Sequence, residues 1–178
     1  MSLHSTPVTL DVTVCTSSVP ERAAMLTEAV ASLNAQTVRP AAHLIRVNHA
    51  REPLAVSWMR LVEMVDTEWL CLFCDDDLLY PHHLETLLDH SDDVDAVWSW
   101  CDSEGADFGV NLYNHDYDPM TLARRNALPS CGLTRTEVFR AAGGWWDEPG
   151  CDWRTWQRIE AAGGRFRAVP IVTWRLRY

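Results

Sequence analysis

The chain has 178 residues, 47% of them hydrophobic and 22% charged, so it can bury the core of one domain and leaves little room for a second. No apolar run reaches the roughly 18 residues of a membrane span and residues 1–7 lack signal-peptide features, so we expect a cytoplasmic protein. All 15 basic residues are arginine, which excludes lysine-dependent chemistry, and the net charge of −10 argues against whole-surface binding of nucleic acid.

Segments rich in β-branched residues alternate with segments of helical periodicity. We expect strands over residues 8–15, 43–48, 69–74, 95–100 and 169–174. We expect helices over residues 23–36, 54–65, 81–89, 136–142 and 152–162. This alternation predicts an α/β fold with a mostly parallel sheet, and the polar segment 101–130 is expected to be irregular.

Polar residues follow each of the first three expected strands. Thr16, Ser17 and Ser18 begin the loop after the first strand, Asn48 follows the second, and an acidic triplet follows the third. Ligands of parallel sheets bind at the carboxyl ends of the strands, so these residues are expected to share one edge of the sheet and one ligand.

The acidic triplet consists of Asp75, Asp76 and Asp77, directly after the apolar segment 69–74. Three adjacent carboxylates repel one another, and Mg²⁺ or Mn²⁺ would relieve that repulsion and bridge the phosphates of a nucleotide. The alternative is an acidic turn that caps the helix expected from Pro81.

The cysteines and the adjacent histidines are not expected to bind metal. Cys71 and Cys74 form a CxxC pair, but residues three apart on a strand point to opposite faces. We therefore expect buried thiols, and we expect His82 and His83 to be a solvated pair.

A glycine-rich turn followed by two tryptophans is a second candidate site. Gly143 and Gly144 allow the chain to turn sharply. Trp145 and Trp146 are candidates for a ligand wall, since rings stack on the C–H faces of sugars and the adjacent carboxylates accept hydrogen bonds from hydroxyls. Asp152 is either a general base or only the N-cap of the last expected helix.

Together these segments resemble the family-2 inverting glycosyltransferases of the GT-A fold. The resemblance rests on the Thr-Ser loop and first helix, the acidic triplet after a buried strand, and segments 135–148 and 151–158. It covers about 8–177, with a gap over 101–130. It implies a single compact domain over residues 1–178, a Rossmann-like α/β/α sandwich in which 101–130 is the acceptor-side segment.

The resemblance implies transfer of a sugar from a nucleotide-diphosphate sugar, with UDP-sugars favoured and Mn²⁺ or Mg²⁺ as cofactor. It assigns the nucleotide to Thr16, Ser17, Ser18, Arg22, Asn48 and Asp75, and the metal to Asp76 and Asp77. It assigns the diphosphate also to Arg175, with Arg177 as the alternative. It assigns deprotonation of the acceptor hydroxyl to Asp152. We expect the acceptor to contact Trp145, Trp146 and Asp147.

The chain departs from the family's pattern at several positions. Cys74 replaces the first Asp of the family's acidic motif, and Asn48 replaces an Asp that binds uracil. Cys151 replaces the Glu before the catalytic Asp. Met59 or Arg60 stands near the position where the family has an Asn. These departures leave open a degenerate nucleotide-sugar or glycan-binding module. A metal-dependent phosphodiesterase at the acidic triplet also stays open.

The acceptor is not determined by these residues. A glycan, a small molecule, a protein side chain and modified DNA all stay open. Because the chain is short for this fold, we expect the acceptor-binding segment to be trimmed or to come from a partner subunit or a homo-oligomer.

Overall fold

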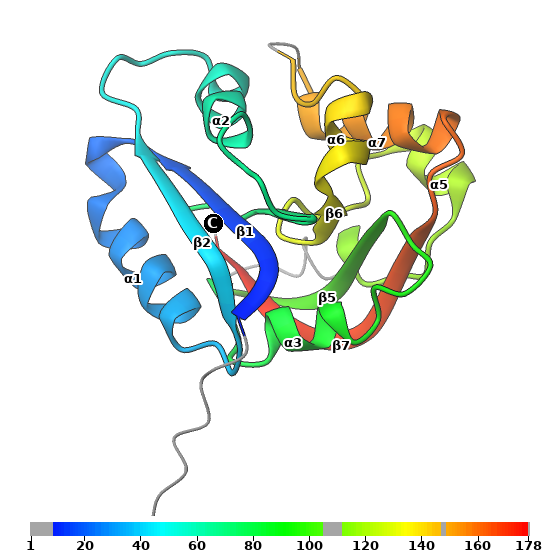
Figure 1. The fold of residues 1–178 in the computed structure, drawn as a ribbon, viewed down its shortest axis with the longest axis horizontal. Coiled ribbons are helices and arrows are strands. Elements are labelled where there is room, and N and C mark those ends of the chain that lie inside the picture. Colours follow the sequence, from blue (N-terminus) through cyan, green and yellow to red (C-terminus); the bar gives the residue numbers. More distant parts are fainter. Residues whose placement is uncertain (1–8, 105–111, 147–148, 178) are drawn as a thin grey trace, which may run out of the picture.

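A computed structural model describes residues 9–104, 112–146 and 149–177. Its strands form one seven-stranded sheet, in the order β2-β1-β3-β6-β5-β7-β4 (Figure 1). The strands are β1 (Thr9–Ser18), β2 (Arg39–Val47), β3 (Trp69–Leu72), β4 (Leu78–Leu79), β5 (Ala96–Glu104), β6 (Leu133–Arg135) and β7 (Phe166–Arg177). The helices are the 3-10 helix η1 (Pro20–Arg22) and α1 (Ala23–Asn34), α2 (Leu54–Val62), α3 (His83–Leu88), α5 (Pro119–Arg124), α6 (Thr136–Ala141) and α7 (Cys151–Ala161).

Most of the sheet runs in one direction. β1 pairs in parallel with β2 and β3, and β5 pairs in parallel with β7. β6 lies antiparallel between β3 and β5, and β4 is antiparallel to β7 at the edge. The carboxyl ends of β1, β2 and β3 therefore meet at one edge of the sheet, as the sequence predicts.

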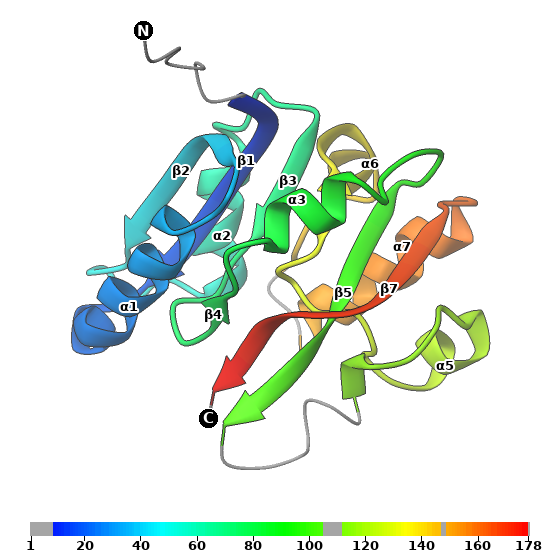
Figure 2. The same cartoon turned by 90° about the horizontal axis from the view of Figure 1, so that it is seen from below.

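Helices cover both faces of the sheet and enclose two buried clusters. α1 and α3 contribute Leu33 and Leu84 to the cluster on one face, while α2, α6 and α7 contribute Trp58, Phe139 and Trp156 to the other. Figure 2 looks onto the α1 and α3 face, with α2, α6 and α7 behind the sheet. The predicted α/β/α sandwich is confirmed.

Four of the five predicted strands are longer than the sequence predicts, whereas β3 ends at Leu72, two residues before its predicted end. Thr16, Ser17 and Ser18 were expected in a loop, but they are the last residues of β1 and pair with β2. β5 continues to Glu104 because it pairs with β7 over its whole length. Both errors have one cause: the partner strand that extends each ladder is distant in the sequence.

The segment 101–130 is also less irregular than expected. Besides the end of β5 it holds α5, and its residues 105–111 lie outside the described part of the chain. Asp118 caps α5 by accepting hydrogen bonds from the backbone N–H groups of Met120 and Thr121. Pro119 at the first helical position fits the same start signal, which the sequence interpretation missed.

The prediction of a solvated histidine pair is wrong for His83. Its side chain is fully buried, with Nδ1 2.7 Å from Thr173 Oγ1 and Nε2 3.0 Å from the carbonyl oxygen of Cys131. Helical spacing places His83 on the inner face of α3 with Leu84 and Leu87. His82 precedes the helix and is exposed. Among the described helices, none has the length and apolar character of a membrane span.

Candidate functional site

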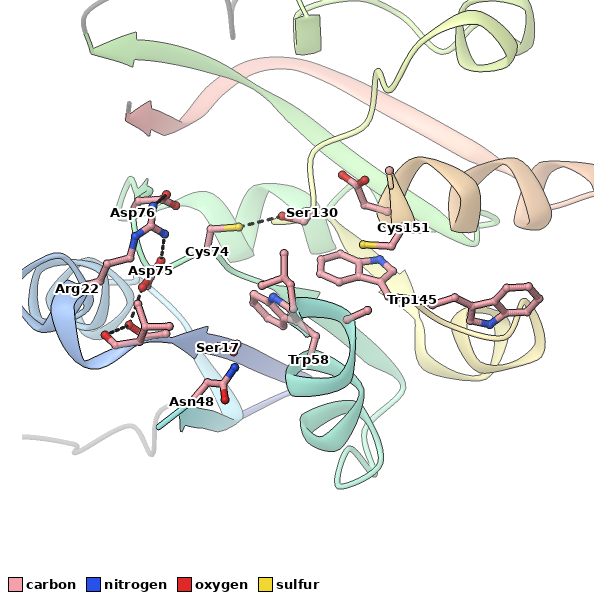
Figure 3. Close-up of a pocket in the computed structure, with 17 residues that line it drawn as sticks. Ser17, Arg22, Asn48, Trp58, Cys74, Asp75, Asp76, Ser130, Trp145 and Cys151 are labelled. Carbon is pink, nitrogen blue, oxygen red and sulfur yellow. Dashed lines mark hydrogen bonds and ion pairs between the residues drawn. The ribbon is translucent and has the colours of Figure 1, made fainter. Parts of the chain in front are cut away.

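A cavity of about 660 Å³ lies where β1, β2 and β3 end (Figure 3). Its wall comes from the end of β1 with η1, the acidic turn after β3, and the start of α7 with the turn before it. Nine of the predicted site residues line it: Ser17, Ser18, Arg22, Asn48, Asp75, Asp76, Trp145, Trp146 and Asp152. The fold therefore brings the two candidate sites of the sequence together.

Arg22 bridges two carboxylates of the acidic turn. Its Nη1 lies 2.8 Å from Asp75 Oδ1 and its Nη2 lies 2.9 Å from Asp76 Oδ2. The Ser18 hydroxyl donates a 2.6 Å hydrogen bond to the other oxygen of Asp75. Asp75 is nearly fully buried by these partners, whereas the Asp76 side chain keeps 28% of its surface exposed to the cavity.

Asp77 lies deeper and faces the last strand. Only 6% of it is exposed, and its Oδ1 accepts a 3.2 Å hydrogen bond from the backbone N–H of Arg177. Burial, reinforced by the neighbouring charge of Asp76, raises the pKa of Asp77 to about 7. Asp77 does not line the cavity. One of its carboxylate oxygens nevertheless lies within 4.8 Å of the Cys74 sulfur and of a carboxylate oxygen of Asp76.

The capping alternative for the acidic triplet is wrong. Strand β4 separates the triplet from α3, and His82 occupies the N-cap position of α3 without a side-chain hydrogen bond. The carboxylates are instead held by Ser18, Arg22 and the backbone of Arg177. None of the three carboxylates therefore provides the N-cap of α3.

Asn48 closes the loop between β2 and α2. Its Nδ2 donates to the carbonyl oxygen of Glu52 (2.9 Å), and its Oδ1 accepts from the backbone N–H of Glu52 (3.1 Å). Its own backbone N–H donates to the carbonyl oxygen of Ser18. Asn48 thus fixes the loop at the cavity wall and joins the ends of β1 and β2.

Asp152 is the second residue of α7, and Gly150 is the N-cap, so the capping alternative is wrong here as well. Its Oδ2 accepts a 2.6 Å hydrogen bond from Asn126 Nδ2, and its Oδ1 accepts one from the backbone N–H of Trp153. These two donors orient a half-buried carboxylate at the cavity wall.

Two tryptophans form the apolar part of the wall. Trp145 and Trp58 meet edge to face with ring centroids 5.3 Å apart, and both are buried. Trp146 is 54% exposed, and its ring carries the guanidinium of Arg158 4.3 Å above its centroid. The turn that presents them has Gly143 and Gly144 at φ +85° and +64°, as the sequence predicts for two glycines.

Three predicted residues lie outside the cavity wall, and one lies outside the described residues. Thr16 is buried, and its hydroxyl oxygen lies 3.0 Å from His43 Nε2. Arg175 makes a bidentate ion pair with Asp102, in which its Nε and Nη2 donate to the two carboxylate oxygens. Asp77 lies behind Asp76, and Asp147 is not among the described residues.

The sequence interpretation missed several residues at the site. Asn126 and Ser130 come from the segment treated as irregular, and no local pattern marks them, because their partners Asp152 and Cys74 are distant in the sequence. Ser57 Oγ lies 2.7 Å from Ser17 Oγ and joins α2 to β1. Trp58 of α2 is both buried and part of the cavity wall.

Solved structures with the same arrangement of strands and helices include sugar-transferring enzymes. S. aureus TarS 1–349 in complex with UDP matches with a TM-score of 0.75 and 10% identity, over 95% of this chain and 61% of that chain. The same fragment in complex with UDP-GlcNAc matches with a TM-score of 0.72, at 10% identity over 95% and 59% of the two chains. The mannosyltransferase PcManGT from Pyrobaculum calidifontis, in complex with GDP-Man and Mn²⁺, matches with a TM-score of 0.71, at 15% identity over 93% and 56%.

The chain has a GT-A-like glycosyltransferase fold. It covers less than two thirds of the length of each of these three chains. No family profile matches the sequence, and no curated protein is similar to it at a significant level. At 10–15% identity the likeness establishes the fold alone.

Proposed function

We propose that the chain is a glycosyltransferase that moves a sugar from a nucleotide-diphosphate sugar to an acceptor hydroxyl with inversion. The observation that carries the proposal is the convergence of Arg22, the acidic turn and Asp152 on one cavity of a GT-A-like fold. A cavity of about 660 Å³ is within the size range of small-molecule sites. We also propose that residues 1–178 form a single domain.

The donor nucleotide is assigned to the side of the cavity formed by β1 and the acidic turn. Arg22 is the cation there, and its guanidinium suits a phosphate because it donates two parallel hydrogen bonds. Asp75 binds the ribose, and Ser17, Ser18 and Asn48 line the space for the base. UDP is the favoured nucleotide, and the complexes of TarS with UDP and UDP-GlcNAc support this choice, whereas the PcManGT complex with GDP-Man keeps GDP as the alternative.

A divalent cation fits the acidic turn. Asp76 and Asp77 offer carboxylate oxygens, which Mn²⁺ and Mg²⁺ accept as ligands, and the mannosyltransferase complex contains Mn²⁺. When bound, the cation would neutralise charge on the departing nucleoside diphosphate. Arg22 adds positive charge from the protein itself on the same side of the cavity.

Asp152 is assigned as the general base. It removes the proton from the acceptor hydroxyl while the acceptor oxygen attacks the anomeric carbon and the nucleoside diphosphate leaves with its bonding electrons. Attack from the face opposite the leaving group inverts the configuration. Asn126 and the backbone of Trp153 hold the carboxylate in one orientation for this step.

The acceptor is assigned to the side of the cavity with Trp145 and Trp146, together with Asp147. The exposed ring of Trp146 suits stacking on a sugar. A glycan, a small molecule, a protein side chain and modified DNA are the candidate acceptor classes. A partner subunit or a second copy of the chain is proposed to complete this side.

Calorimetric titration with UDP and GDP, each with Mn²⁺ and with EDTA, tests the donor site. We expect one nucleotide to bind only with metal and Asp76→Ala to lose that binding. Absence of binding for both nucleotides would contradict the proposal. It would favour the hypothesis of a binding module whose site is degenerate.

The substitution Asp152→Asn tests the catalytic assignment. We expect transfer, measured as release of nucleoside diphosphate in the presence of acceptor, to fall by at least about a hundredfold, because the amide cannot accept the proton. Nucleotide binding should stay unchanged. Glu160→Gln, in the same helix but outside the cavity wall, is the matched control and should retain transfer. Full activity of Asp152→Asn would remove Asp152 from this role.

A further inference from the structure

The acidic turn contains a sulfur ligand in addition to its carboxylates. Cys74 Sγ and one carboxylate oxygen each of Asp76 and Asp77 all lie within 4.8 Å of one another. Two ligands on opposite sides of one cation are separated by about twice a bond of roughly 2.3 Å, so these three atoms can contact the same ion with little movement. In the described part of the chain, no other group of three or more such side chains is this close.

Cys74 is a half-buried residue of the cavity wall. Cys74 and Asp76 line the cavity, and Figure 3 shows both at its wall. The Ser130 hydroxyl lies 3.5 Å from the Cys74 sulfur and can donate to it once the sulfur is a thiolate. Cys71, by contrast, packs in the cluster on the opposite face of the sheet and donates to the carbonyl oxygen of Cys131. The CxxC pair is therefore divided between two faces, as predicted, and only Cys74 joins the acidic turn.

A thiolate among the ligands changes which metal is preferred. Mg²⁺ binds oxygen ligands and keeps much of its water, whereas thiolates favour softer ions. A site with both sulfur and oxygen ligands also binds Co²⁺ more tightly than Mn²⁺, and it binds Zn²⁺ more tightly than Mn²⁺. A cysteine at this position therefore weakens the case for Mg²⁺ and strengthens it for Co²⁺ and Zn²⁺.

We infer that Cys74 is a metal ligand of the acidic turn, together with Asp76 and Asp77, and that it selects Zn²⁺ and Co²⁺ over Mg²⁺. The site is the one to which the proposed function assigns its cation, but the inference concerns the sulfur ligand and the choice of metal. The metal-binding part does not depend on which reaction the protein performs.

Titration of the metal-free protein with Co²⁺ tests the inference, because a cobalt–thiolate bond gives a near-ultraviolet charge-transfer band that carboxylates do not give. We expect the band in the wild type, its loss on addition of Zn²⁺, and its persistence in a large excess of Mg²⁺. Cys74→Ser should lose the band and at least about tenfold in Co²⁺ affinity. Cys74→Asp should lose the band and gain affinity for Mg²⁺ relative to Co²⁺.

Cys151→Ser is the matched control. Cys151 is a second half-buried thiol of the same cavity wall, but it is not part of the three-ligand group. This variant should keep the band. The inference is overturned if the wild type binds Co²⁺ without the band, if it binds no Co²⁺ at all, or if Cys74→Ser keeps the band.

Nucleotide titration of the same samples separates this inference from the proposed function. A band without binding of UDP or GDP would support the sulfur ligand and contradict the donor site. Metal-dependent nucleotide binding without a band would support the donor site and overturn the role of Cys74. Circular dichroism of each variant checks that a lost band is not a lost fold.

Discussion

The guanidinium of Arg22 occupies the position of a cation between Asp75 and Asp76. The Arg22 side chain is 46% exposed and that of Asp76 is 28% exposed, so this ion pair is screened by solvent and is weak, whereas Asp75 is only 4% exposed. A metal bound at the site proposed for Asp76 would compete with Arg22 for the same carboxylate. Arg22 can therefore exchange its contact with Asp76 for one with a phosphate at a smaller energetic cost than its contact with the buried Asp75.

The substitution Arg22→Gln separates these two roles. Without nucleotide, we expect Mn²⁺ to bind about two- to fivefold more tightly, because the competing charge is gone. With metal present, UDP should bind about tenfold more weakly or worse, because a charge-assisted contact to phosphate is lost. Calorimetric titrations of both ligands measure these shifts. If the two affinities change in the same direction, the competition does not exist.

The sequence identifies the residue types at the site better than their partners. The acidic triplet and Asp152 stand out locally, because a run of carboxylates after an apolar strand and an acidic helix start are visible in a short window. Arg175 was assigned to a diphosphate, but it pairs with Asp102, which lies 73 positions away. Which partner a charged side chain takes depends on contacts between distant segments, and a sequence pattern does not contain them.

The turn before α7 depends on glycine at two adjacent positions. At Gly144 the backbone has φ +64°, and a Cβ would lie 2.6 Å from the sulfur of Met59. The Gly144 carbonyl oxygen also accepts hydrogen bonds from Thr155 and Arg158. The turn thereby fixes Trp145 against α2 and connects the cavity wall to α7.

Replacement of Gly144 by alanine is expected to destabilise the protein by about 1–3 kcal/mol, from backbone strain together with the contact to Met59. Gly163→Ala is the matched control, since Gly163 has φ +85° but nothing within 4 Å of an added Cβ. Gly163→Ala should lower the free energy of unfolding by about 1 kcal/mol, from backbone strain alone. Urea unfolding of both variants measures the difference. Equal losses would show that Met59 moves aside freely.

Elements with a clear local period were predicted well, and elements defined by pairing were not. The five expected helices are all present, within three residues at each end. The short strands β4 and β6 were missed, since they are defined by antiparallel pairing with distant strands, β4 with β7 and β6 with β3 and β5. The sequence therefore predicts the layers of the fold, while the order of strands and the full extent of β5 and β7 depend on tertiary contacts.

The fully buried His83 and the half-buried His43 make the stability of the whole molecule depend on pH. Burial lowers the pKa of both His43 and His83 to about 4. Below the ordinary histidine pKa of about 6.5, the unfolded chain binds protons that the folded protein binds only near pH 4, so the free energy of unfolding falls as pH falls through this range. Asp77 has the opposite effect. Its pKa is raised to about 7, so as pH falls the folded protein binds this proton before the unfolded chain does, and the free energy of unfolding rises.

The variant His43→Asn isolates the histidine contribution, because Asp77 and His83 are the same in both proteins. We expect its free energy of unfolding to fall less steeply than that of the wild type as pH is lowered from 6.5 towards 4. Urea unfolding at several pH values in this range, with EDTA present, gives the two slopes. Parallel slopes would mean that His43 is protonated in the folded protein as readily as in the unfolded chain.

The contact between Trp58 and Trp145 gives the cavity an optical property of its own. Two indole rings 5.3 Å apart and 67° from parallel couple their electronic transitions, and such a pair produces a circular dichroism signal that depends on their mutual angle. One ring belongs to α2 and the other to the glycine turn. Any movement of these two walls relative to each other therefore changes the absorption of polarised light, so opening or closing of the cavity can be followed without a label.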